Sequence, residues 1–258
     1  LQLAKPNDTV IIVGRNADKG RRAEQAIAKS TGASVSFMQV DMSLMSAVQK
    51  FANKLLTNYP KIDYLIHCAG VIMPEPVITR EGLELVFATQ YLSRYYLMQF
   101  LLPALNDSGK VVVVSGGNVT DGIVNYDELN NEGSFGMYKT VRNTSKIQSL
   151  YTLVLMTDHP HLGIYNYGPG IVKTSISRNM SGIRGLLVSI ASRFVAISPE
   201  KVGEEIATLL TGSYESGWYK KGLKKQPSNG ETFTAEQAKL KQFSDGLLQF
   251  MQDPAGSH

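Results

Sequence analysis

The sequence has few of the features that mark secreted, membrane-spanning or nucleic-acid-binding proteins. Its 258 residues include one cysteine, Cys68, which excludes an internal disulfide and suits a reducing compartment. No apolar run reaches about 18 residues, so no transmembrane helix is expected, and no secretory signal is visible. The net charge of +4 is too small and too scattered for a nucleic-acid-binding face. These absences favour a cytoplasmic protein with no nucleic-acid partner.

One basic run stands out near two aromatic residues, Trp218 and Tyr219. It holds the lysines Lys220, Lys221, Lys224 and Lys225. We interpret this run as a solvated surface turn, with contact to a partner or a membrane surface as the alternative.

Strand-like and helix-like segments alternate along the chain, and 43% hydrophobic composition is enough for the core of one domain. Repeating βα units of this length predict an α/β fold with a doubly wound parallel sheet, in a single domain covering residues 1–258. Ligands of such sheets bind beyond the carboxyl ends of the strands. The predicted strands are 9–14, 33–40, 62–70, 110–117 and 163–170; the predicted helices are 18–30, 44–58, 80–105, 135–157, 198–210 and 232–252.

Several short motifs follow the predicted strands in a fixed order. They are 14-GRN-16, 41-DMS-43, 68-CAG-70, Lys146 in a long helix, 169-PGIVKT-174 and the helix start 198-SPE-200. In this order and spacing, the chain resembles the short-chain dehydrogenase/reductase (SDR) superfamily over nearly its whole length. The resemblance implies a Rossmann-like fold and a nicotinamide dinucleotide cofactor.

The resemblance assigns the choice of cofactor to Arg15 and Asn16. In the family an acidic residue here accepts the ribose hydroxyls of NAD, whereas an arginine meets the 2′-phosphate of NADP. Arg15 carries a permanent charge and a forked set of donors suited to phosphate oxygens, and Asn16 adds a neutral donor. We therefore expect NADP(H), with a solvated surface arginine as the alternative reading of Arg15.

Other cofactor contacts are implied by the same resemblance. Asp41 and Met42 match the pair that borders the adenine, and Ala69 and Gly70 match small residues that let the backbone approach the cofactor. The segment that orients the nicotinamide and its phosphates corresponds to Pro169, Gly170, Val172 and Thr174. His67 and Cys68 replace the usual asparagines. As neighbours on a strand they point to opposite faces, so we do not expect a metal site.

The glycine-rich loop of the family has no counterpart in this sequence. The chain opens at 1-LQLAKPNDTV-10, which matches the end of the family's first helix running into its second strand. One βα unit of roughly 30 residues is therefore absent. We expect the natural protein to be longer; a naturally shortened chain that cannot hold pyrophosphate is the alternative.

The catalytic positions of the family are mostly altered. Aligning Lys146 with the family lysine places Arg142 where the family has its proton-donating tyrosine, and arginine stays protonated at any workable pH. It can still stabilise a developing negative charge. The serine position falls on Gly116, which has no hydroxyl, and the asparagine position falls on Gln90.

A second alignment pairs Tyr138 with Arg142 as Tyr-x-x-x-Arg, but it makes the helix one turn too long. In either alignment Tyr138 lies one turn from Arg142 on the same helix face. We predict a cleft lined by Arg142, Tyr138 and Gln90 and capped by a substrate lid at 175–197. Apolar residues at helical spacing in that segment leave membrane association as an alternative.

These features favour a noncanonical NADP(H)-dependent oxidoreductase acting on a bulky apolar metabolite. Lys146 keeps its cofactor role in this hypothesis and Arg142 acts as an electrophile. Two alternatives remain: a non-redox cyclase or isomerase of specialised metabolism, and a non-enzymatic binding protein on the same scaffold. Pairs of long helices often form family dimers, so a homo-oligomer is possible by analogy.

Overall fold

The computed structural model describes residues 3–115, 124–130, 133, 135–173, 196–227 and 233–252. The chain begins with two βα units: β1 (Thr9–Gly14), α1 (Ala17–Thr31), β2 (Ser34–Gln39) and α2 (Met45–Asn58). β1 and β2 pair in parallel, with Thr9 opposite Ser34 and Gly14 opposite Gln39. They form a two-stranded sheet of their own.

The second sheet has the order β3-β4-β5-β6-β7. Its strands are β3 (Ile62–His67), β4 (Leu105–Val114), β5 (Gly163–Gly168), β6 (Gly217–Lys220) and β7 (Lys224–Gln226). The first four run parallel, and β7 returns antiparallel to β6. The predicted α/β fold with a parallel sheet is thereby confirmed.

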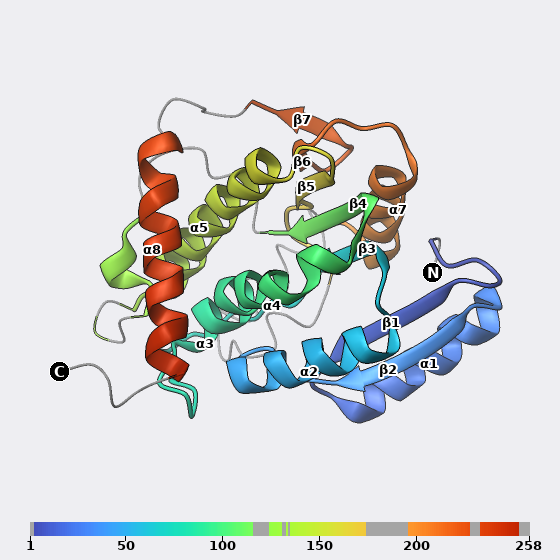
Figure 1. Cartoon of the computed structure of the whole chain (residues 1–258), viewed down its shortest axis with the longest axis horizontal. Helices are drawn as coiled ribbons and strands as arrows, with labels where there is room; N and C mark the ends of the chain where they lie inside the picture. Colours follow the sequence, from blue (N-terminus) through green and yellow to red (C-terminus); the bar gives the residue numbers. More distant parts are fainter. Residues whose placement is uncertain are drawn as a thin grey trace.

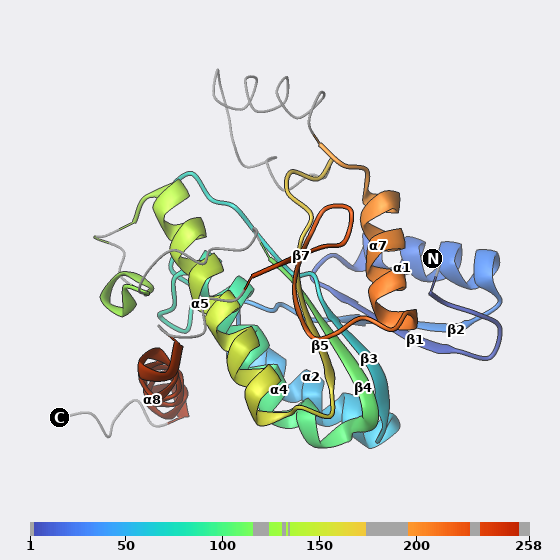
Figure 2. The same cartoon turned by 90° about the horizontal axis from the view of Figure 1, so that it is seen from above.

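Helices cover both faces of this sheet (Figures 1 and 2). Figure 2 shows α7 (Pro199–Thr211) on one side, and α4 (Ser93–Leu101) and α5 (Met137–Asp158) on the other; α1 lies over the two-stranded sheet β1–β2. The last helix, α8 (Phe233–Gln252), packs on α5 at the outside of the second layer (Figure 1). Between β3 and α4 lie the short α3 (Leu85–Phe87) and a π-helical turn, η1 (Ala88–Leu92).

Local sequence signals explain how α1 begins, packs and ends. The side-chain oxygen of Asn16 accepts a hydrogen bond from the backbone N–H of Lys19 and caps the first turn. Gly20 faces the ring of Phe37 on β2, and a Cβ there would come within 2.2 Å of that ring. Gly32 ends the helix at φ +72°, which favours glycine. The glycine in 17-ADKGRR-22 thus lets α1 approach β2 closely.

The larger hydrophobic core lies between the second sheet and the layer of α2, α4, α5 and α8. Its fully buried side chains include Phe87, Tyr91, Leu92 and Met98 from the segment between β3 and β4, and Ile147 from α5. A smaller cluster lies under α7 on the opposite face; it contains Val112, Tyr165, Tyr167, Ile206, Leu209, Leu210 and Tyr219.

One predicted helix differs from the structure. The helix expected over 80–105 begins only at Leu85, because residues 78–84 form a hairpin-like turn with a bridge between Ile78 and Glu84. The expected surface turn around the lysine run is confirmed: it is the turn of the hairpin β6–β7. Trp218 and Tyr219 are each only 4% exposed there, so they anchor a strand while the lysines face outward.

Among the described residues, the outer edges of β1 and β3 are two of the strand edges that have no partner. β1 pairs only with β2, and β3 pairs only with β4, although β1 and β3 are neighbours in both views (Figures 1 and 2). Tyr64 and Ile66 on β3 are 46% and 38% exposed, and Val13 on β1 is 40% exposed. Contacts between α2 and α4 join the two sheets below this gap.

Across the described part of the chain, no helix combines the length and the apolar character needed to cross a membrane.

Candidate functional site

The carboxyl ends of β1 and β2 carry the residues expected to meet the nucleotide. Arg15 follows β1 directly, and its side chain is 61% exposed. Its guanidinium lies 4.0 Å from a carboxylate oxygen of Asp41, at the outer limit of an ion pair. The other oxygen of Asp41 accepts hydrogen bonds from the backbone and hydroxyl of Ser43, which fixes the turn into α2. Met42 is partly buried against the larger core.

The turn after β3 is held by a side chain from the π-helical segment. Gln90 lies in the centre of η1, and its Nε2 donates to the carbonyl of Val71 at 3.0 Å. A Cβ added at Gly70 would lie 3.4 Å from the side-chain oxygen of Gln90. A Cβ at position 70 would therefore only make ordinary van der Waals contact with this side chain. π-Helical turns frequently occur at functional sites.

One residue that the sequence analysis did not single out, Arg94, holds the same turn from below. It lies one helical turn after Gln90, is only 3% exposed, and donates to the carbonyl of Ala69 at 2.7 Å. It also donates to the carbonyl of Val114 at 2.9 Å and to Oε1 of Gln148 at 2.6 Å. Arg94 could have been identified from the sequence as a single arginine inside the apolar run 91-YLSRYYLMQFLL-102, because a buried charge needs specific partners.

The histidine at the end of β3 is neutral in this environment. Burial, helped by the positive charge of Arg94, lowers the pKa of His67 to about 3. Cys68 next to it is exposed. Within the described residues, no group of three or more histidine, cysteine, aspartate or glutamate side chains is placed to hold a metal ion.

The proposed catalytic residues of α5 occupy one face of that helix. Tyr138, Arg142 and Lys146 follow each other at intervals of four residues. Tyr138 is 74% exposed, Arg142 is exposed, and Lys146 is half-buried. Lys146 is therefore the least exposed of the three. Gln90, the fourth predicted catalytic residue, instead contacts the turn after β3.

The ends of β4 and β5 complete the edge of the sheet. Ser115 is buried, and its hydroxyl donates to the side chain of Asn166 on β5 at 2.7 Å, so this hydroxyl faces the interior. Pro169 is buried and Gly170 has φ +77°, a conformation that favours glycine. Val172 bridges to Ile197. The predicted positions Gly116 and Thr174, and most of the predicted lid at 175–197, lie outside the described residues.

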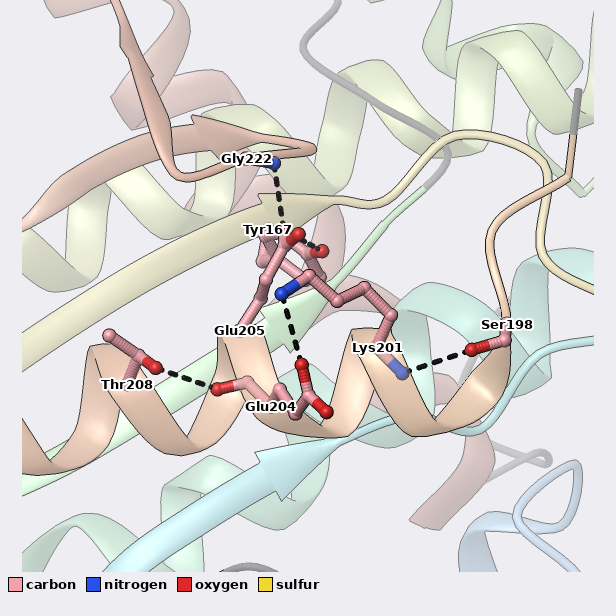
Figure 3. A network of polar contacts seen from close by, with 7 residues as sticks. All are labelled: Tyr167, Ser198, Lys201, Glu204, Glu205, Thr208 and Gly222. Carbon is pink, nitrogen blue, oxygen red and sulfur yellow. Dashed lines mark hydrogen bonds and ion pairs between the residues drawn. The ribbon is translucent and has the colours of Figure 1, made fainter.

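A separate groove of about 510 Å³ lies between α7 and the hairpin β6–β7. Glu205 is 5% exposed here and accepts from the Tyr167 hydroxyl at 2.6 Å and from the backbone N–H of Gly222 at 2.9 Å (Figure 3). Lys201 pairs with Glu204 on the outer face of the same helix. Because Glu205 already bonds to β5 and the hairpin, we interpret this network as a structural link.

The described residues thus define an α/β protein whose candidate site lies at the carboxyl edge of its parallel strands. The short chain dehydrogenase family model matches residues 1–126. Human retinol dehydrogenase 14 is 27% identical over 146 residues, and human polyprenol dehydrogenase is 26% identical over 189 residues. These matches cover 55% and 69% of this chain, but only 44% and 57% of the two relatives' own lengths.

Solved structures agree with this assignment at the level of the fold. A protein from Mycobacterium paratuberculosis superposes with a TM-score of 0.67 at 20% identity, covering 96% of both chains. A dehydrogenase from Burkholderia cenocepacia with bound NADP gives a TM-score of 0.63 at 20% identity, covering 83% of this chain and 82% of that one. Residues 1–126 are thus similar in sequence to the short chain dehydrogenase family, and the fold of these solved structures agrees over most of the chain.

Proposed function

We propose that this chain binds NADP(H) at the carboxyl edge of its sheet and acts as an oxidoreductase of the short-chain dehydrogenase type. The observation that carries the proposal is Arg15, a largely exposed guanidinium directly after β1 with no acidic residue at position 15 or 16. In the family that the chain resembles, an arginine at this position meets the 2′-phosphate of NADP, and a guanidinium fork suits phosphate oxygens.

The described residues fit such a cofactor in two further respects. Gly70 in the turn after β3 has no side chain, so the backbone of this turn can lie close to a ligand. Gly170 after β5 takes a left-handed conformation with nothing within 4 Å of an added Cβ. By the family resemblance, Asp41 and Met42 border the adenine, and Pro169, Val172 and Thr174 lie along the nicotinamide and phosphates.

When bound, the dinucleotide supplies or accepts a hydride. In this proposal Lys146 orients the ribose, and Arg142 stabilises negative charge on the substrate without giving up its own proton. Tyr138 and Gln90 line the substrate side. The substrate is a bulky apolar molecule, in keeping with two relatives named as dehydrogenases of retinol and polyprenol.

Thermal shift and calorimetric titration with NADPH and NADH test the cofactor assignment. We expect NADPH to stabilise the chain more than NADH, and Arg15→Ala to weaken NADPH binding about tenfold or more, the value of a lost charge-assisted bond. NADH binding should change little. Arg22→Ala, which removes an exposed arginine from α1, is the matched control. Equal loss in both variants, or no binding of either dinucleotide, contradicts the proposal.

Arg142 also favours a second candidate function, catalysis without net redox change. A residue that cannot exchange its proton is poorly suited to an ordinary ketone reductase but is suited to stabilising an anionic intermediate in a cyclisation or isomerisation. Product formation measured with and without NADPH separates the two. Strict consumption of NADPH supports the reductase, whereas turnover without any cofactor supports the non-redox enzyme. Tight protein binding with no turnover of either kind supports a non-enzymatic role.

A further inference from the structure

Arg94 is a buried charge for which the described residues provide no carboxylate partner. Its side chain is 3% exposed, and all three of its hydrogen-bond acceptors are neutral: the carbonyls of Ala69 and Val114 and the side-chain oxygen of Gln148. Burial lowers the pKa of Arg94 to about 10, so the guanidinium remains charged at neutral pH. Charged side chains are almost never fully buried unless they are paired.

These contacts place the charge at the candidate site. Ala69 belongs to the turn after β3, Val114 is the last residue of β4, and Gln148 lies on α5 two residues beyond Lys146. One guanidinium therefore joins three elements that reach the carboxyl edge. The turn itself is also held by Gln90, one helical turn before Arg94, through the carbonyl of Val71.

The groups around Arg94 do not balance its charge. The Nε atom of Arg94 and the Nε2 atoms of His67 and Gln148 are buried and have no hydrogen-bond partner among the described residues. His67 is neutral, as described above. A glutamate at position 148 would have the same shape and reach and would form a buried ion pair with Arg94. No hydrogen bond would be lost, because Nε2 of Gln148 makes none among the described residues. The chain instead has a glutamine, and the described residues leave the positive charge uncompensated.

We infer that this uncompensated charge strengthens the binding of an anionic dinucleotide at the turn that Arg94 holds. The inference rests on the proposed function. It adds Arg94 as a residue that does not touch the ligand but acts through its electrostatic field and through its hydrogen bond to the carbonyl of Ala69. A charge behind the site in a medium of low dielectric constant acts over about 10 Å with little screening.

The test measures Tm and NADPH affinity in two variants. One is expected to lower the affinity without lowering Tm, and the other to lower Tm with little change in affinity. Gln148→Glu neutralises the charge and keeps the 2.6 Å hydrogen bond, so we expect an unchanged or higher Tm but about tenfold weaker NADPH binding. Arg94→Lys keeps the charge but loses the planar fork, so we expect a lower Tm and NADPH affinity within about threefold of the natural chain.

Ser244→Ala serves as the control for stability alone. It removes the buried hydrogen bond between Ser244 and Tyr91, 2.6 Å long, from α8. We expect it to lower Tm without changing the Kd for NADPH. If the role of Arg94 is purely structural, NADPH affinity follows Tm in all variants. That result, or an unchanged NADPH affinity in Gln148→Glu, overturns the inference and leaves the proposed function standing. No NADPH binding by the natural chain overturns the proposed function and the inference with it.

Discussion

At the scale of single residues, His67 makes the stability of the protein depend on pH. Its imidazole is 6% exposed and its pKa falls to about 3 in the folded chain, whereas an unfolded histidine titrates near 6.5. Between these values the unfolded chain binds a proton that the folded chain does not. Stability is therefore highest above pH 6.5 and falls as the pH decreases through that value toward 3.

We expect this one group to reduce the free energy of unfolding by about 2 kcal/mol between pH 7.5 and pH 5.0. Urea unfolding at the two pH values measures the change. His67→Asn should remove it, while His161→Asn, which changes an exposed histidine, should retain it. An equal pH dependence in the natural chain and in His67→Asn would show that His67 is not protected from protonation.

The positions of single site residues were predictable to different degrees. Arg15 follows an apolar strand directly and Gly70 comes three residues after one, so the strand pattern places both near the edge of the sheet. Arg94 was not predictable in this role, because its contacts come from three elements that are distant in sequence. Tyr138 lies on the predicted helix face, but its 74% exposure depends on what packs around α5.

At the scale of elements, periodicity predicted long helices and apolar strands well. The predicted strand 9–14 and helix 44–58 correspond closely to β1 and α2. The hairpin β6–β7 was missed because its strands have four and three residues, and lysines interrupt their apolar pattern. The π-helical turn η1 leaves no signal in side-chain periodicity over five residues.

The link between α7 and the sheet gives an element-scale prediction. Glu205 accepts from Tyr167 of β5 and from Gly222 of the hairpin (Figure 3). Burial and the bond to Glu205 raise the pKa of Tyr167, so its phenol remains a donor. Glu205→Ala leaves both donors unsatisfied, and we expect a loss of about 3 kcal/mol in the free energy of unfolding.

Denaturant unfolding measures this loss, and two variants define its origin. Glu205→Gln retains an acceptor, so most of the stability should return. Glu204→Ala changes the adjacent residue, whose pair with Lys201 is exposed, and should cost less than about 1 kcal/mol. Similar losses in Glu204→Ala and Glu205→Ala would show that the network does not tie α7 to the sheet.

At the scale of the whole molecule, the open edge of β3 is the most exposed apolar feature of the sheet. Leu65 packs against the larger core, so alternation along the strand turns Tyr64 and Ile66 to the opposite face, on the side of α7. Unpaired strand edges bordered by apolar side chains promote pairing with other chains. We therefore expect this 258-residue chain to self-associate with rising concentration.

The double variant Tyr64→Lys with Ile66→Lys tests whether β3 causes this association. Both side chains are substantially exposed, at 46% and 38%, so the change should cost less than about 1 kcal/mol of stability. Light scattering across a concentration series should show a lower average mass than for the unsubstituted chain. Ile78→Lys with Tyr214→Lys adds the same charge at exposed positions away from β3 and should leave association unchanged. If both double variants reduce association equally, net charge rather than the open strand controls it, because added charge alone also keeps protein molecules apart.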